Sequence, residues 1–225
     1  MAHQPQDLEQ WMPLAKRSNR FILHEIQDQI DEATCLAVAS VGTVEARYNK
    51  SQLNKKDWRA FSPLYAIDQT YKTQHRVRGT SSFKAVEHLM KRGGICLDDK
   101  YKRGKKTHQV IRGLHLHIRE GVREDDPNER LILRLLQDGP VVGVLRELYE
   151  GEYGDGAGAE FGNHAIIIIG YGSTADGRHF FYIRNSYGYQ WCDEGFSKVL
   201  RKTSTGRAKS LFRTIWYPED VSAHE

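Results

Sequence analysis

The residues around the first cysteine read Gln29-Ile-Asp-Glu-Ala-Thr-Cys35-Leu-Ala-Val-Ala-Ser-Val-Gly-Thr-Val-Glu45. Small and apolar residues follow Cys35 too densely for one exposed face, so we predict a largely buried helix from about Thr34 to Tyr48. A thiol in the first turn of a helix faces unpaired backbone N–H groups and the positive end of the helix dipole, and both favour the thiolate. Cys35 is therefore a candidate nucleophile, provided that a histidine and an orienting amide occur elsewhere.

Composition limits the class of protein. The chain has 225 residues, 39% of them hydrophobic and 28% charged, which suits one two-lobed domain with a sizeable core. The formal net charge of +4 is mild, and ordinary solubility explains it without nucleic acid. Three widely spaced cysteines argue against a disulfide framework and for a reducing compartment, so we expect a cytoplasmic protein. The start lacks the apolar core of a signal peptide, and no apolar run reaches transmembrane length, so we expect no membrane association.

The hydrophobic pattern changes along the chain. Before about residue 108 it is mostly helical: two short helices are expected between Ser51 and Thr70, and an amphipathic helix from Phe83 to Lys91 is stopped by Gly93-Gly94. A further helix is expected from Glu129 to Gln137. Beyond Gly139-Pro140, short apolar runs separated by glycine-rich loops indicate an antiparallel sheet or barrel; they are Val141–Leu145, Ala165–Gly170 and Phe180–Arg184.

The spacing of His115 and His117 raises the question of a metal site. Residues 110–119 alternate as a strand, which places His115 and His117 on one face. A metal site would need a third ligand nearby, and the sequence indicates none, so we predict no metal site here.

Four segments resemble, in order, the papain family of cysteine proteases. Cys35 and the helix after it are similar to the nucleophile helix of that family, and Gln29 lies six residues earlier, where the family has its oxyanion-hole glutamine. Asn163-His164-Ala165 is similar to the start of the histidine strand. Arg184-Asn185-Ser186-Tyr187-Gly188 resembles the motif Lys-Asn-Ser-Trp-Gly. Each piece alone is common, but their order and spacing make chance agreement improbable.

The resemblance implies an α+β, papain-like two-lobed fold, with a helical lobe, an antiparallel β-barrel lobe and the active-site cleft between them. The expected domain covers residues 11–218, with the helical lobe at about 29–108 and the β lobe at about 109–218. Residues 1–10 and 219–225 are expected to be flexible tails. Only about thirty residues precede Cys35, so we expect no inhibitory prodomain.

The resemblance also implies the roles of the site residues. Cys35 and His164 would form a thiolate–imidazolium pair, Asn185 would orient the histidine, and the Gln29 amide would stabilise the oxyanion. The substrate-binding positions that it implies are Gly79, Thr80, Val144, Asn163, Ala165 and Tyr187. The expected partners are a peptide or protein substrate and a protein inhibitor; we expect a monomer without cofactor, metal or bound nucleic acid.

Departures from the family motif keep other functions open. Leu36 follows the nucleophile and Tyr187 stands in the Asn-Ser motif, where the family has tryptophan at both positions, and Glu32 replaces a disulfide cysteine. The acidic pair Asp31-Glu32 also disfavours a thiolate nearby. One alternative is a catalytically silent module that binds a peptide or protein in the cleft. Another is a deamidase or acyl-transfer enzyme that uses the same scaffold.

Overall fold

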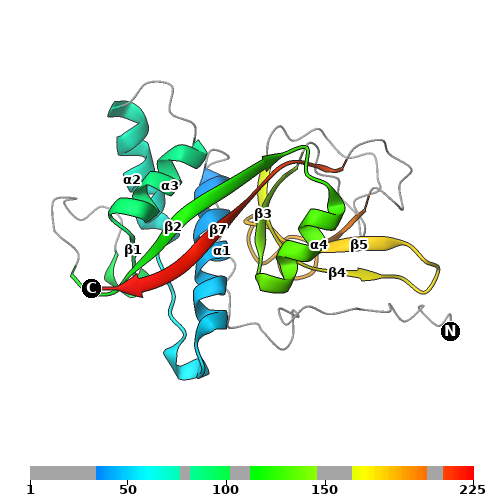
Figure 1. The fold of residues 1–225 in the computed structure, drawn as a ribbon, viewed down its shortest axis with the longest axis horizontal. Helices are drawn as coiled ribbons and strands as arrows, with labels where there is room; N and C mark the ends of the chain where they lie inside the picture. Colours follow the sequence, from blue (N-terminus) through cyan, green and yellow to red (C-terminus); the bar gives the residue numbers. More distant parts are fainter. Residues whose placement is uncertain (1–33, 77–81, 102–111, 146–163, 202–209) are drawn as a thin grey trace.

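The computed structural model describes residues 34–76, 82–101, 112–145, 164–201 and 210–225. Helices and antiparallel strands both occur in these residues, which confirms the expected α+β class (Figure 1). The helices are α1 (Cys35–Ser51), α2 (Pro63–Arg76), α3 (Ser82–Arg92) and α4 (Glu129–Asp138). The strands are β1 (Ile95–Cys96), β2 (His115–Asp125), β3 (Val141–Leu145), β4 (His164–Ser173), β5 (His179–Arg184), β6 (Phe196–Leu200) and β7 (Phe212–His224).

The strands form one antiparallel sheet in the order β1-β2-β7-β3-β4-β5-β6. The two long strands β2 and β7 run from the helices α2 and α3 to the strands of the second half (Figure 1). The expectation of a flexible tail at residues 219–225 is wrong for most of that segment. Strand β7 continues to His224, because Glu219 to His224 still pair with β2.

Both faces of β3 and β4 are buried, which explains why these strands read as continuous apolar runs. Alternate side chains point to opposite faces. Val144 and Ile167 belong to the core that contains α1, whereas Leu145 and Ile166 belong to the core that contains α4. Complete burial of such a side chain contributes about 1.5–3 kcal/mol relative to exposure. The sheet is therefore held between α1 on one face and α4 on the other.

Two cations near the end of α1 bind the C-terminal end of α4. Lys50 donates to the carbonyls of Gln137 and Asp138, with N···O distances of 2.7 and 2.9 Å, and Arg47 Nε donates to the carbonyl of Pro140 at 3.1 Å. The last carbonyls of a helix lack partners within the helix and attract positive charge. Burial lowers the pKa of Arg47 to about 10, so it stays charged at neutral pH. These contacts fix α1 against the start of β3.

Most of the expected elements are confirmed, with differences at their boundaries. Helix α1 ends three residues later than predicted, and of the two short helices expected after Ser51 the first is only a 3₁₀ turn at Lys55–Asp57. The strand expected at residues 110–119 begins at His115 and continues to Asp125. The amides of Gly93 and Gly94 both donate to the carbonyl of Leu89, as expected for the end of α3. Among the described helices, none has the length and apolar character needed to cross a membrane.

Candidate active site

Cys35 is the first residue of α1, at the edge where this helix packs on β4. Only 6% of the residue is exposed, and the backbone N–H of Ala165 donates to its sulfur at 3.4 Å. The sulfur therefore lies at the positive end of the helix dipole and accepts a hydrogen bond from the strand that begins with His164. Both interactions favour negative charge on sulfur.

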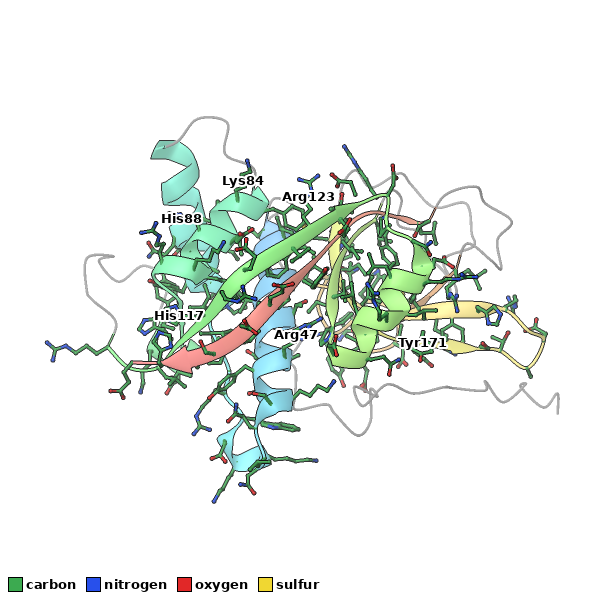
Figure 2. All side chains as sticks on the ribbon, viewed as in Figure 1. Arg47, Lys84, His88, His117, Arg123 and Tyr171 are labelled. Carbon is green, nitrogen blue, oxygen red and sulfur yellow. The ribbon has the colours of Figure 1, made fainter. Side chains whose placement is uncertain are left out.

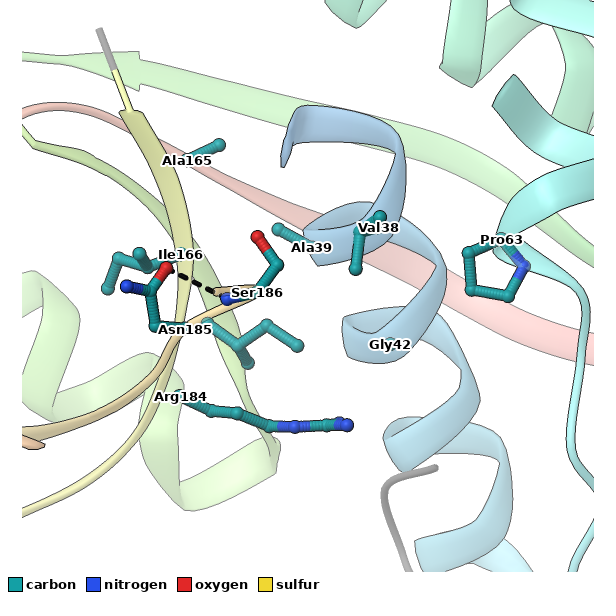
Figure 3. Close-up of a pocket in the computed structure, with 10 residues that line it drawn as sticks. Val38, Ala39, Gly42, Pro63, Ala165, Ile166, Arg184, Asn185 and Ser186 are labelled. Carbon is teal, nitrogen blue, oxygen red and sulfur yellow. Dashed lines mark hydrogen bonds between the residues drawn. The ribbon is translucent and has the colours of Figure 1, made fainter. Parts of the chain in front are cut away.

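His164 opens β4 opposite Leu145 and is 4% exposed. Its Nε2 atom lies 2.6 Å from Oδ1 of Asn185, which follows directly after β5 and is 3% exposed. The backbone N–H of Ser186 donates to the same Oδ1 at 2.8 Å (Figure 3). Because this oxygen is an acceptor, Nε2 of His164 must be the donor. The hydrogen then lies on Nε2, and Nδ1 is left to exchange a proton with a thiol.

An aromatic ring covers the histidine and is itself packed against a second one. The ring of Tyr187 stacks on His164 with a centroid distance of 4.6 Å and an interplanar angle of 25°. Trp191 meets Tyr187 edge to face at 6.2 Å. Tyr187 thus occupies the place of the tryptophan in the family motif and lies over the ring that Asn185 orients. Such stacking restricts the rotation of the imidazole and excludes water from one of its faces.

A cavity of about 20 Å³ lies between α1 and the strands β4 and β5, large enough for about one water molecule. Figure 3 shows its lining, with Val38, Ala39 and Gly42 on the helix, and Asn185 and Ser186 on the opposite side. Arg184 also lines it, and its side chain extends from the end of β5 toward α1. The space that remains between α1 and these strands, beside Asn185, is therefore about the size of one water molecule.

The model of the family described as papain family cysteine protease matches residues 13–214. The chain belongs to the papain family. Among curated relatives, falcipain-2a of Plasmodium falciparum is 27% identical over 209 residues, which cover 80% of this chain and 41% of that protein. The KDEL-tailed cysteine endopeptidase CEP2 of Arabidopsis thaliana is 29% identical over 191 residues, covering 79% of this chain and 51% of that protein. The chain thus spans about half the length of these relatives.

Solved structures of the papain family confirm the fold. The bromelain protease from Ananas comosus, in complex with the E64 inhibitor, superposes with a TM-score of 0.68 at 21% identity, covering 89% of this chain and 95% of that one. A recombinant stem bromelain precursor gives a TM-score of 0.69 at 20% identity, covering 96% of this chain and 70% of that one. The papain-like two-lobed arrangement predicted from the sequence is therefore correct.

The structure brings together three of the four residues predicted to be catalytic: Cys35, His164 and Asn185. Of the predicted substrate-binding residues, Val144 and Ala165 face each other across β3 and β4, the N–H of Ala165 donates to the sulfur of Cys35, and Tyr187 stacks on the histidine. The other predicted residues lie outside the described part of the chain; they are Gln29, Gly79, Thr80 and Asn163.

Several groups that contribute to the site are not evident from the sequence. The N–H groups of Ala165 and Ser186 are backbone donors, which no side-chain motif reveals. The buried charges Arg184 and Glu45 also went unnoticed, although both lie within the segments that resemble the family.

None of the three cysteines, all within the described residues, forms a disulfide. In the ranges that the structure describes, no group of three His, Cys, Asp or Glu side chains is arranged to hold a metal ion.

Proposed function

We propose that this chain is a cysteine peptidase that hydrolyses peptide bonds through Cys35, His164 and Asn185. The observation that carries the proposal is the 2.6 Å contact between His164 and Asn185, directly beside a cysteine at the start of a helix. A buried structural cysteine would need neither a histidine of fixed tautomer nor an amide that orients it. Membership of the papain family supports the same reaction.

The mechanism follows from the protonation states. Nδ1 of His164 takes the thiol proton, and the thiolate of Cys35 attacks the carbonyl carbon of the substrate. Asn185 accepts the hydrogen bond from Nε2 and keeps the imidazolium in place through the step. The backbone N–H of Cys35 and the Gln29 amide stabilise the oxyanion, and loss of one such donor typically costs about 2.7–4 kcal/mol. His164 then protonates the leaving amine, and water hydrolyses the thioester.

The proposal also includes the residues that bind the peptide substrate. Val144 and Ala165 are apolar and pair across β3 and β4, and the N–H of Ala165 donates to the sulfur of Cys35, so the second residue before the scissile bond is expected to be apolar. We propose that Tyr187 contacts the leaving-group side of the substrate, and that Gly79, Thr80 and Asn163, which lie outside the described residues, also bind the peptide. We further propose a monomer that acts in the cytoplasm and is open to protein inhibitors, and the sparse cysteines support a reducing compartment.

An epoxide inhibitor of the E64 type tests the nucleophile, because it reacts with an activated thiol in a peptide-binding cleft. We expect one label per chain on Cys35, and complete loss of labelling in Cys35→Ala. Peptide cleavage should fall by at least about 10⁴-fold in the same variant. Cys192→Ser is the matched control: Cys192 is exposed, and its loss should change neither labelling nor cleavage.

Two results would contradict the proposal. The first is a wild-type protein that neither reacts with the epoxide nor cleaves any peptide in a diverse library. The second is a protein substrate that gains one dalton with its chain intact, since this would indicate deamidation instead of hydrolysis of the peptide bond. Intact-mass spectrometry of treated substrates separates these reactions.

A further inference from the structure

Two opposite charges are buried at the junction between α1 and β5. Arg184 is 6% exposed and Glu45 is 1% exposed. Burying a charge is costly unless an opposite charge or hydrogen bonds compensate it. Burial lowers the pKa of Arg184 to about 10. The negative charge of Glu45 has the opposite effect and partly offsets this shift. The guanidinium therefore remains charged at neutral pH and faces a buried acidic partner.

The two residues connect the elements that carry the site. Arg184 is the last residue of β5, pairs with Ile167 of β4 and immediately precedes Asn185. Its side chain extends toward α1 near Gly42 (Figure 3). Glu45 lies three residues beyond Gly42, on the same side of that helix. The carboxylate is also fixed from the other direction, because its Oε2 accepts the backbone N–H of Phe61 at 2.9 Å.

We infer that Arg184 and Glu45 form a positioning pair, which sets the end of β5 against α1 and so aligns Asn185 and His164 with Cys35. This inference rests on the proposed peptidase function. Asn185 is one peptide unit from Arg184, so a shift of the strand end moves its Oδ1 atom relative to His164. Cys35 is carried by the same helix as Glu45, so the pair links the two halves of the site directly.

Stability alone is a weak reason for such a pair. Buried ion pairs can often be replaced by uncharged residues of similar volume with little loss, whereas removal of one partner leaves an uncompensated charge. What the pair supplies is a defined geometry between helix and strand. A displacement of about 1 Å at a catalytic group can reduce the rate by about a hundredfold. The pair should therefore affect the reaction more than the folding.

The test removes both charges together, so that neither is left buried alone. In Arg184→Met/Glu45→Gln the glutamine oxygen can still accept the N–H of Phe61. All variants carry Cys192→Ser, so that iodoacetamide reports on Cys35. We expect the double variant to fold with a Tm near that of the parent protein. We also expect kcat to fall about ten- to a hundredfold with a similar KM, and the acid limb of the alkylation rate to move to higher pH.

Two further variants separate positioning from packing. Arg184→Lys keeps the positive charge and should recover kcat and the alkylation profile to within about threefold of the parent. Arg201→Met/Glu129→Gln removes a partly buried ion pair between the end of β6 and α4, whose N···O distance is 3.4 Å. This matched control should leave both kcat and the alkylation profile unchanged.

The inference is overturned if the folded double variant has the kcat and alkylation profile of the parent, or if the control pair has the same effect. Failure of the proposed function looks different. In that case the parent protein cleaves no peptide, and its alkylation shows no acid limb below the range of an ordinary thiol. An active parent with an unaffected double variant rejects only the positioning pair.

Discussion

Two histidine environments in this molecule differ in the partner that each ring meets. At the site, Nε2 of His164 donates to a fixed amide oxygen at 2.6 Å, and the ring stacks on Tyr187. At the far end of the long strands, His117 stacks on His224 with centroids 4.2 Å apart and lies 6.5 Å from His115. We call these three residues the histidine cluster; β2 and β7 bring it together beside α3 (Figure 2).

The partner of each imidazole decides what the ring can do. Asn185 offers an acceptor that stabilises a charged ring, which a catalytic base requires. In the cluster, burial lowers the pKa of His117, and the neighbouring His224 and His115 lower it further. The carbonyl of Met90 accepts a hydrogen bond from the ring and opposes this shift without reversing its direction. The hydrogen bond to Asn185 thus stabilises a protonated His164 ring, whereas the surroundings of His117 disfavour its protonation.

The largest expected effect is on the catalytic environment. Asn185→Ala removes the acceptor for Nε2 of His164, and a hydrogen bond to a charged group is worth about 1.5–3 kcal/mol. We therefore expect kcat/KM to fall about ten- to a hundredfold, measured with a fluorogenic peptide.

Asn128→Ala is the matched control for that substitution. Asn128 caps α4 by accepting the N–H of Arg130 at 2.9 Å, far along the chain from the site residues. Its loss should cost about 1 kcal/mol of stability and leave kcat/KM unchanged. Equal kcat/KM values for the Asn185 and Asn128 variants would show that the amide does not act on His164.

The sequence predicted the site better than it predicted the histidine cluster, for a physical reason. Cys35, His164 and Asn185 each lie in a short motif, and each motif depends on local chemistry: a helix start, a strand start, and a turn after a strand. The cluster depends on the pairing of β2 with β7, in which His115 faces His224. That register joins distant parts of the chain, so no local pattern in residues 110–119 could reveal a third histidine.

The same distinction separates correct from incorrect fold predictions. The apolar runs of β3 and β4 and the helix α1 were recognised because burial on all sides leaves a dense apolar pattern. The end of β7 has a half-buried, charged pattern, which reads as a solvent-exposed tail until its partner strand is known. Arg184 and Glu45 were missed likewise, because a buried charge is recognised only through its partner.

A substitution at Gly94 can disturb the histidine cluster while all three histidines are kept. Its φ is +67°, and a Cβ atom there would lie 2.5 Å from Nε2 of His117. Gly94→Ala should therefore destabilise the protein by about 1–3 kcal/mol, through backbone strain and displacement of the ring. Gly177→Ala is the control, since φ is +85° but nothing lies within 4 Å of the added Cβ. Chemical denaturation should show a smaller loss for Gly177→Ala; equal losses would mean that the ring is easily displaced.

The smallest expected effect concerns the titration of the cluster. The pKa of His117 in the folded state lies below its ordinary value of 6.5, so the unfolded chain binds the proton more readily. The corresponding stability is complete above about pH 6.5 and is lost as the pH falls toward the folded pKa.

Removing the titrating ring in His117→Phe should therefore reduce the fall in Tm between pH 7.5 and about pH 5.5. His88→Gln, at an exposed position of α3, should keep the full fall. Parallel Tm curves for the wild type and His117→Phe would show that the cluster accepts protons without cost.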